Sequence, residues 1–406
     1  MHILVVTQYF WPENFRINDI VSGLHERGHQ ITVLTGHPNY PTGSFASGYD
    51  GRSVRDEQYE GIRVLRVPML PRGQKSGLRL GLNYLSFALS GSLLAPWLAR
   101  DRYDSILVYG LSPITAAFPA VVMKKKIGRP LVFYLLDLWP ESLSATGFVT
   151  HPVLLSGVTK IVRFIYRACD MILVTSRAFI PRVKRLGASP ARIHYFPQYA
   201  EPEYQPQSAD ASWAATQGLP PGFKIMFAGN MGTAQDLFTV LDAAERTSDC
   251  GIHWVLVGDG RVKVDLEAQV AERQLSNVYF MGSRPSSEMP KFFAEADALL
   301  ISLTADELFS LTVPAKLQSY LASGRPVLAS LGGEGAEIVR EAGAGLVVHP
   351  ANAEALAAAA LQLKEMDRPV REALGQQGRE YSNRHFGREA RLTELEGLLA
   401  QILVTP

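Results

Sequence analysis

The chain repeats one pattern of hydrophobic and polar positions at the start of each half. An apolar run, a polar turn and an amphipathic segment follow one another in residues 1–35 and again in residues 224–245. Such a sequence predicts a buried strand followed by a crossover helix. Two doubly wound parallel sheets are therefore expected, and open sheets of this kind bind phosphorylated ligands at the carboxyl ends of their strands.

The same alternation continues through both halves and predicts a series of strands and helices. In the first half the expected strands are 2–7, 30–35, 62–67, 105–109, 131–136, 171–175 and 193–196, and the expected helices are 17–27, 78–95, 114–126, 156–168 and 178–186. In the second half the expected strands are 225–228, 252–257, 278–280, 298–301, 326–329 and 345–348. A long loop rich in Gly, Pro, Ser and Tyr is expected between residues 36 and 60.

A length of 406 residues exceeds what one hydrophobic core supports, so two domains are expected. Residues 1–200 form the first, and residues 223–381 form the second. The segment 201–222 is the expected linker, because five prolines fall between residues 197 and 221. A helical tail over residues 382–406 is expected to pack back on the first domain.

The net charge of +1 conceals an asymmetry between the two halves. Residues 1–200 carry a net charge of +11, and residues 201–406 carry −10. The basic half could bind anionic lipid or a phosphorylated acceptor. Alternatively, the opposite charges of the two halves could hold the two domains together. Cys169 and Cys250 have no metal-site spacing and fit a reducing cytoplasm, and no signal peptide is expected after Met1.

Residues 80–99 form a stretch of 20 residues without a charge, long enough for a membrane span. The stretch contains Asn83, several serines and Pro96, which a simple anchor would lack. A helix of the first domain, buried or lying at the membrane surface, is expected in preference to a span.

Glycine turns and one lysine in the second half are candidate phosphate ligands. The turn Gly229–Gly232 joins a strand to a helix, where it serves either an anion or helix packing. Arg284 follows the strand that ends near Gly282, either at a ligand or on a plain surface loop. Lys316 falls in the first turn of a predicted helix, where it opposes the helix dipole unless an anion binds there.

Carboxylates in the first half are candidate catalytic groups. Asp137 and Glu141 follow a buried strand, and either could orient a hydroxyl or act as a base. Asp137 could instead cap a helix. Asn14 and Arg16 occupy the first strand-to-helix turn, where Arg16 either supplies charge to a ligand or lies on the helix surface.

Several enzyme classes lack their signatures in this sequence. The motifs GxxxxGK[ST] and GxSxG are missing, which argues against P-loop NTPases and α/β-hydrolases, while the letters HExxH occur once, at residues 25–29. His25 and His29 are four residues apart, but a helix end separates them, so a metal pair is not expected there.

Six segments resemble the family 4 glycosyltransferases of the GT-B fold, in the order expected for that family. They are VTQYFWPE, ERGHQITVLTGHPNYP, LLDLWPESL, FAGNMGTAQDL, FMGSRP and PAKLQSYLASGRPVLAS. The resemblance covers nearly the whole chain. The chain is similar to the branch that acts in O-antigen, capsule and colanic acid synthesis. Members of this branch transfer N-acetyl-fucosamine-like sugars, among others.

The resemblance implies a role for each candidate residue. Gly229, Asn230, Gly232 and Gln235 would lie by the donor diphosphate, and Gly282 with Arg284 would contact the base. Thr312, Pro314, Gln318 and Ser319 would hold ribose and phosphates, and Asp137 would line the reaction centre. The donor would be a nucleoside diphosphate sugar, UDP-linked, used with retention and without a metal or other cofactor. The acceptor would be a polyprenyl diphosphate-linked saccharide at the inner face of the cytoplasmic membrane, and no nucleic acid partner is expected.

The chain also departs from the family pattern. Asn230 and Gln235 stand where many members carry Arg and Lys, and Leu311 and Ser319 stand where most carry glutamates. Lys316, with Arg16 or Arg284, would have to supply the missing positive charge. Two alternatives stay open: a hydrolysing sugar-nucleotide 2-epimerase of the same fold, and a non-catalytic nucleotide-sugar-binding partner of a glycan assembly complex.

Overall fold

The computed structural model describes residues 1–73, 77–145 and 151–404 of the chain. The chain folds into two compact units. The first contains Met1–Pro197 together with Glu389–Pro406, and the second contains Gln198–Arg388. Residues 405–406 of the expected helical tail lie outside the described residues.

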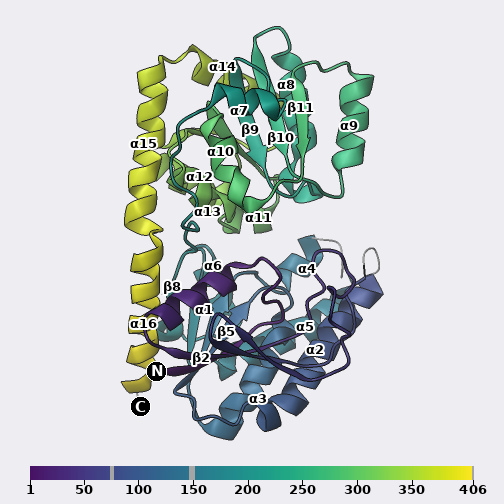
Figure 1. The fold of residues 1–406 in the computed structure, drawn as a ribbon, viewed down its shortest axis with the longest axis vertical. Helices are drawn as coiled ribbons and strands as arrows, with labels where there is room; N and C mark the ends of the chain where they lie inside the picture. The colour runs from purple at the N-terminus through teal and green to yellow at the C-terminus, as the bar shows by residue number, and fades with distance from the viewer. Residues whose placement is uncertain (74–76, 146–150, 405–406) are drawn as a thin grey trace. The chain divides into compact units, whose positions relative to one another are not determined.

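The first unit is built on an eight-stranded sheet with the order β3-β4-β2-β1-β5-β6-β7-β8. Strands β2, β5 and β8 of this sheet are labelled in Figure 1. Its strands are β1 (His2–Val6), β2 (Gln30–Thr35), β3 (Arg55–Tyr59), β4 (Ile62–Arg66), β5 (Ser105–Gly110), β6 (Leu131–Leu135), β7 (Met171–Val174) and β8 (Ile193–Tyr195). Neighbouring strands are parallel except for β3, which runs antiparallel to β4. Because β1, β5 and β6 are central and covered on both faces, their residues form continuous apolar runs, as the sequence predicts.

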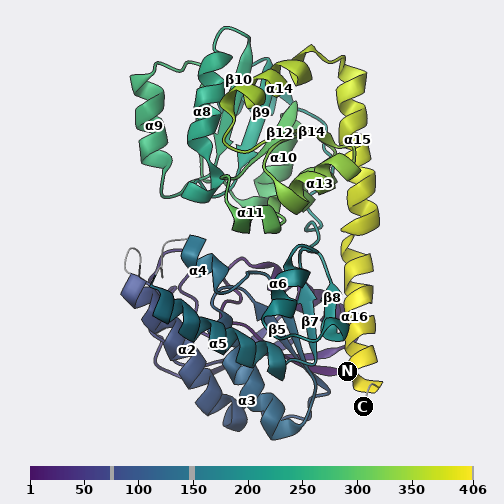
Figure 2. The same cartoon turned by 180° about the vertical axis from the view of Figure 1, so that it is seen from behind.

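Helices cover both faces of this sheet, and α2, α3 and α5 pack side by side (Figure 2). The helices of the unit are α1 (Arg16–Glu26), α2 (Gly77–Leu98), α3 (Phe118–Ile127), α4 (Glu141–Ala145), α5 (Pro152–Ala168), α6 (Phe179–Arg185) and α16 (Arg388–Val404). Two 3-10 turns, η1 (Ile114–Ala117) and η2 (Pro190–Arg192), complete it.

Strand β3 corrects the expectation of an uninterrupted loop over residues 36–60. Every residue of RDEQY is exposed or half-buried, so this edge strand has no apolar face to reveal it. Glu60 and Gly61 both have positive φ, 50° and 81°, and form the tight turn into β4. Strand β3 also carries Glu57, whose carboxylate lies 2.9 Å from the fully buried guanidinium of Arg66.

The C-terminal tail is two helices, where the sequence predicted one helical stretch from residue 382. Helix α15 (Arg368–His385) ends before Gly387, and α16 starts at residue 388. Helix α16 packs on the first unit through an apolar stripe that includes Leu395 and Leu399. Polar contacts add to this packing: Arg27 forms an ion pair with Glu389 at 2.6 Å, and the imidazole of His29 is hydrogen-bonded to Glu396 at 2.7 Å.

The second unit contains a six-stranded parallel sheet with the order β11-β10-β9-β12-β13-β14. The strands are β9 (Phe223–Ala228), β10 (Ile252–Val257), β11 (Val278–Gly282), β12 (Ala298–Ser302), β13 (Val327–Ser330) and β14 (Gly345–Val348). The helices besides α15 are α7 (Ala211–Thr216), α8 (Leu237–Arg246), α9 (Lys263–Glu272), α10 (Met289–Ala294), α11 (Glu307–Leu311), α12 (Lys316–Ala322), α13 (Gly333–Glu341) and α14 (Ala353–Glu365), with 3-10 turns η3 (Thr233–Gln235) and η4 (Ser286–Glu288).

The expected linker over residues 201–222 is partly structured and belongs to the second unit. Helix α7 lies within it, and its start is capped by the Asp210 carboxylate, which accepts hydrogen bonds from the amides of Ser212 and Trp213. The Trp213 ring packs edge-on against Phe292 of α10, with ring centres 5.0 Å apart. The prolines that suggested a linker flank this short helix.

Helix α2 contains most of the uncharged stretch 80–99. One side of it is buried, with Asn83, Phe87 and Gly91 among the enclosed residues. Within the parts of the chain that the structure describes, no helix combines the length and the apolarity needed to cross a bilayer.

Candidate active site

Three strand-to-helix turns meet at the carboxyl edge of the second sheet and are joined by backbone hydrogen bonds. The amide of Gly229 donates to Val257 O at 2.9 Å, and the amide of Gly258 donates to Gly282 O at 2.8 Å. The amide of Met231 donates to Asp259 O at 2.8 Å. The turns after β9, β10 and β11 therefore form one connected rim.

Two glycines that the sequence analysis did not select make this close approach possible. Gly258 has φ 137°, and a Cβ there would lie 2.0 Å from Gly229 O. Gly260 has φ 159°, and a Cβ there would lie 2.4 Å from Met231 O. The sequence could have indicated this turn, because a GDG segment directly follows a buried apolar run, as the GNMG segment does at Gly229.

Backbone amides at the first turn are less available to a ligand than the sequence suggests. Besides Gly229 and Met231, the amide of Gly232 also has an acceptor, the Gln235 side-chain oxygen at 3.0 Å. Gln235 thus holds the turn closed, and Asn230 is exposed beside it. An anion at this rim depends on side-chain charge more than on the amides of these three residues.

Lys316 supplies such a charge, and it is directed toward the Gly229 turn. Its ammonium nitrogen is enclosed and has no hydrogen-bond partner among the described residues, although the residue as a whole is only half-buried. The nitrogen lies 3.8 Å from the centre of the Phe227 ring, and a Cβ on Gly229 would come within 3.1 Å of it. Burial lowers the pKa of Lys316 to about 7.

A buried ammonium beside an aromatic face is only partly compensated, because the ring gives about 1–2 kcal/mol while desolvation costs several. An anion reaching Lys316 would restore the missing charge partner. A phosphate oxygen meets this requirement, since it combines negative charge with hydrogen-bond acceptors. Lys316 is therefore the strongest ligand candidate in the second unit.

The remaining candidates of this unit are distributed around the same rim and helix start. Arg284 donates to Met281 O at 3.1 Å, and its guanidinium lies 5.6 Å from the Phe292 ring centre, so it packs back on its own unit. Gly282 has φ 69°, and the space where a side chain would project is open. These two residues sit together at the end of β11.

The candidates at the start of α12 are largely engaged within the protein. Thr312 donates to Leu308 O at 3.1 Å. The Gln318 amide is buried and, with its nitrogen toward the helix start, donates to Ala315 O at 2.7 Å. Ser319 is 3.4 Å from a Glu201 carboxylate oxygen, and Pro314 accepts from the Leu317 amide at 2.9 Å. Gln318 in particular fixes the helix start, with no side-chain nitrogen turned to a ligand.

In the first unit, Asp137 lies at the carboxyl edge of the sheet, directly after β6. One of its oxygens accepts from both the amide and the hydroxyl of Ser112, at 3.1 and 2.8 Å. Ser112 follows β5 and in turn accepts from the indole N–H of Trp139 at 3.0 Å. Burial raises the pKa of Asp137, and the two Ser112 bonds act in the opposite direction. Sequence reasoning missed Ser112, which only strand pairing brings to Asp137.

Glu141 lies on α4 and interacts with the helix layer. One of its carboxylate oxygens is enclosed without a hydrogen-bond partner among the described residues. Burial raises the pKa of Tyr166 on α5, and the charge of Glu141 adds to that effect. Glu141 therefore interacts electrostatically with Tyr166 of α5, whereas the Asp137 carboxylate is hydrogen-bonded to Ser112.

The first turn of the chain is organised by Glu13, which the sequence analysis did not select as a candidate. This buried carboxylate accepts from the amides of Asn39 and Tyr40, each at 2.7 Å, and of Phe10 at 3.2 Å. Burial raises the pKa of Glu13, while these bonds favour its charged form. Its neighbour Asn14 is exposed.

Arg16 starts helix α1 and is half-buried. Its charge acts on the buried Tyr134 of β6. Across the described ranges, no three His, Cys, Asp or Glu side chains are grouped as a metal site requires.

Two family models match the chain, one in each half. The model described as "Glycosyl transferase 4-like domain" matches residues 14–198, and the model described as "Glycosyl transferases group 1" matches residues 222–365. The chain is therefore a group 1 glycosyltransferase. The expected GT-B fold of two parallel-sheet α/β domains is confirmed.

The relatives agree with this class, and the solved structures agree with the fold. A protein of Escherichia coli K12 assigned to colanic acid biosynthesis as the glycosyl transferase WcaI is 26% identical over 336 residues, covering 80% of this chain and 82% of the relative. Sucrose-phosphate synthase of Thermosynechococcus elongatus has a TM-score of 0.76 at 17% identity, covering 99% of this chain and 98% of that one. Anabaena HepE in complex with UDP has a TM-score of 0.71 at 16% identity, covering 99% and 100%. At these identities the two structures share the fold alone.

Proposed function

We propose that the chain transfers a sugar from a nucleoside diphosphate sugar to a saccharide carried on a polyprenyl diphosphate, with retention at the anomeric carbon. The second unit binds the donor and the first binds the acceptor. The observation that carries this proposal is the buried ammonium of Lys316 at the glycine rim, which has no hydrogen-bond partner in the part of the chain that the structure describes. A diphosphate would bind most favourably at this ammonium.

The donor is proposed to be UDP-linked, and the sugar N-acetyl-fucosamine-like. The solved neighbour HepE is in complex with UDP, and the relative WcaI is assigned to colanic acid biosynthesis, which supports a role in surface polysaccharide synthesis. Such acceptors lie at the inner face of the cytoplasmic membrane, so the chain is placed there as a peripheral protein.

In the proposed reaction the bond between the anomeric carbon and the diphosphate breaks, and negative charge develops on the leaving oxygen. Lys316, protonated when a phosphate oxygen is beside it, stabilises that charge. Asp137 orients the acceptor hydroxyl and accepts its proton as the oxygen bonds to the anomeric carbon. The acceptor hydroxyl attacks the anomeric carbon on the same face of the sugar from which the diphosphate leaves. We assign no side chain as the nucleophile that a double displacement would require.

The proposed mechanism needs no metal, because Lys316 takes the role of neutralising the diphosphate. Turnover that survives chelation with EDTA would agree with this. Turnover that falls with EDTA and returns with added Mg²⁺ would contradict it.

The proposal is tested by identifying the donor and then the product. Thermal-shift screening against UDP, GDP, ADP and dTDP sugars selects the donor, since a ligand of the folded state raises apparent stability. That donor is then incubated with and without a polyprenyl diphosphate-linked saccharide. Sugar appearing on the lipid supports the proposal. Free sugar released without acceptor would identify a hydrolysing epimerase, and tight UDP binding without turnover would identify a binding partner.

A further inference from the structure

Helix α2 exposes a ridge of large apolar side chains along its outer side. Leu78, Leu82, Leu85, Leu89, Leu93 and Trp97 recur every three or four residues, and their exposed fractions range from 43% to 76%. Nineteen residues of helix separate the first from the last, so the ridge is about 28 Å long. Leucines in such a row on an otherwise folded unit mark an interaction surface.

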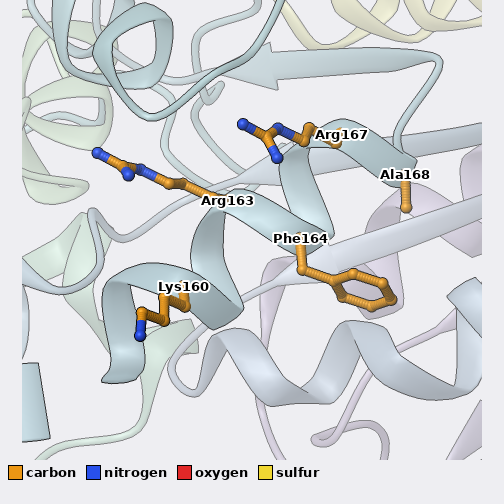
Figure 3. A pocket seen from close by; sticks show the side chains of 5 residues that line it. All are labelled: Lys160, Arg163, Phe164, Arg167 and Ala168. Carbon is orange, nitrogen blue, oxygen red and sulfur yellow. The ribbon is translucent and has the colours of Figure 1, made fainter. Parts of the chain in front are cut away.

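The neighbouring helix α5 continues this apolar surface at its start and adds positive charge along its length. Val153 and Leu154 are 71% and 60% exposed. Lys160, Arg163 and Arg167 follow on the next turns and border a shallow pocket of about 480 Å³ (Figure 3). Apolar residues beside cations are the composition of helices that lie in a membrane interface.

Helix α3 lies between the other two and connects them. Its Lys126 ammonium donates to Pro96 O of α2. Its Phe118 ring stacks on Phe164 of α5 with centres 6.1 Å apart, and the Lys125 ammonium lies 5.7 Å from the same Phe164 ring. The three helices therefore form one continuous face, which we call the α2–α3–α5 face.

The charge on this face is of one sign. The sequences of the three helices contain seven basic residues and no Asp or Glu. The basic residues are Arg79, Lys124, Lys125, Lys126, Lys160, Arg163 and Arg167. Lys124 pairs with Asp170 beyond the face, while Lys125, Lys126 and the three α5 cations are exposed. A partner of this face must therefore be anionic as well as apolar.

The inner side of α2 reaches the carboxyl edge where Asp137 lies. The buried Asn83 side chain accepts a hydrogen bond from the side-chain nitrogen of Gln8 at 2.7 Å and donates one to Leu70 O at 2.6 Å. These bonds fix α2 to the segment after β1. Burial raises the pKa of the next residue, Tyr84, and the charge of Asp137 raises it further. One helix thus connects the exposed ridge to the proposed acceptor edge.

We propose that the α2–α3–α5 face docks on an anionic bilayer, with α2 lying in the plane of the interface and its leucine ridge entering the acyl region. Lys125, Lys126 and the α5 cations contact lipid phosphates at the headgroup level. Docking in this way brings a lipid-linked acceptor to the Asp137 edge, a consequence that rests on the proposed function. A bilayer fits better than a protein partner because the ridge is a regular line of leucines ending in a tryptophan.

The test is flotation of the full chain with vesicles of phosphatidylcholine, with and without 30% phosphatidylglycerol. We expect binding to the anionic vesicles, a loss of about tenfold or more in L89S/L93S, and a similar loss in K160Q/R163Q or in 0.5 M NaCl. V264S/V370S and R246Q/R384Q change exposed residues of the second unit in the same way and should float like wild type. Circular dichroism and an unchanged midpoint of thermal unfolding confirm that each variant is folded.

Three results would overturn the docking proposal. They are equal flotation with both vesicle types, flotation unaffected by L89S/L93S, and a dimer in sedimentation velocity that the same variant dissociates. The flotation assay contains no sugar donor, so it measures docking on the bilayer whether or not the protein transfers a sugar. Conversely, transfer to acceptor in detergent without any vesicle binding would leave the proposed function standing and remove the docking surface.

Discussion

The ammonium nitrogen of Lys316 lies 3.8 Å from the centre of the Phe227 ring and has no hydrogen-bond partner among the residues described. Phe227 belongs to β9 and Lys316 starts α12, so the pair forms where the central strand of the second sheet meets that helix. A protein that keeps a desolvated cation in this way gives up stability in the unliganded state. Functional sites commonly show this exchange of stability for ligand binding.

Replacing Lys316 with Met should stabilise the unliganded protein while it impairs catalysis. The apolar side chain removes an unpaired buried charge, so the free energy of unfolding should rise by about 1–3 kcal/mol at pH 7. Turnover should fall by roughly a hundredfold, because the developing charge on the leaving diphosphate loses its counter-ion. Urea unfolding and steady-state rates measure the two effects. A variant that is less stable than wild type, or equally active, would contradict this role.

Stability should depend on pH through Lys316. Its pKa is lowered from 10.5 in the unfolded chain to about 7 in the folded one. Between these values the unfolded state binds more protons, so the free energy of unfolding rises with pH, by up to about 1.4 kcal/mol per pH unit. The Lys316→Met variant should lose this slope between pH 7 and 10. Identical slopes in both proteins would assign the dependence to other groups.

Binding of UDP should be accompanied by proton uptake above pH 7. A phosphate beside Lys316 favours its charged form and raises its pKa again. Calorimetric titrations of UDP at pH 8 in buffers of different ionisation enthalpy should therefore give different observed enthalpies. Lys316→Met serves as the control, and its observed enthalpies should not vary with the buffer. Absence of uptake in wild type would place the nucleotide away from this lysine.

Gly258→Ala should disrupt the rim of turns. The added Cβ would collide with Gly229 O, and the positive φ adds backbone strain, so a destabilisation of about 3 kcal/mol is expected with loss of donor binding. Gly218 also has a positive φ, 75°, but open space around it. Gly218→Ala should cost only about 1 kcal/mol and leave UDP binding intact. Equal effects of the two substitutions would show that the contact at the rim is unimportant.

Ser112→Ala should alter how Asp137 titrates. The Ser112 hydroxyl bond favours the carboxylate, so its loss raises the pKa of Asp137 further. The acid limb of the kcat/KM profile should shift to higher pH, and the rate at neutral pH should drop by about tenfold. Trp139→Phe keeps the hydroxyl and removes only the indole donor, so its acid limb should stay near that of wild type. An unshifted limb in Ser112→Ala would remove Asp137 as the titrating group.

The sequence predicted the parts of the fold that local pattern determines. Buried parallel strands such as β1 and β10 are continuous apolar runs, and their positions were predicted within a residue or two. Lys316 was selected as a candidate ligand from sequence, because a cation in the first turn of a helix is locally unfavourable. Its burial against Phe227 was not predictable, since the two residues are 89 positions apart.

What the sequence could not predict depends on tertiary contacts. Strand β3 is polar on both faces and pairs only at a sheet edge. Ser112 reaches Asp137 because β5 and β6 are neighbours, and Gly258 matters because Gly229 lies against it. Gln318 and Gln235 were predicted as ligands on the basis of the family pattern, but their side chains make hydrogen bonds within the protein. Those two roles stay predictions that a ligand-bound structure must decide.

The most direct test of the central claim is a crystal structure of the protein with UDP bound. The account predicts the diphosphate at the glycine rim with a phosphate oxygen within about 3 Å of the Lys316 nitrogen, the distance of a charge-assisted hydrogen bond. A nucleotide bound elsewhere, or a diphosphate at the rim with Lys316 still unpaired against Phe227, would contradict it.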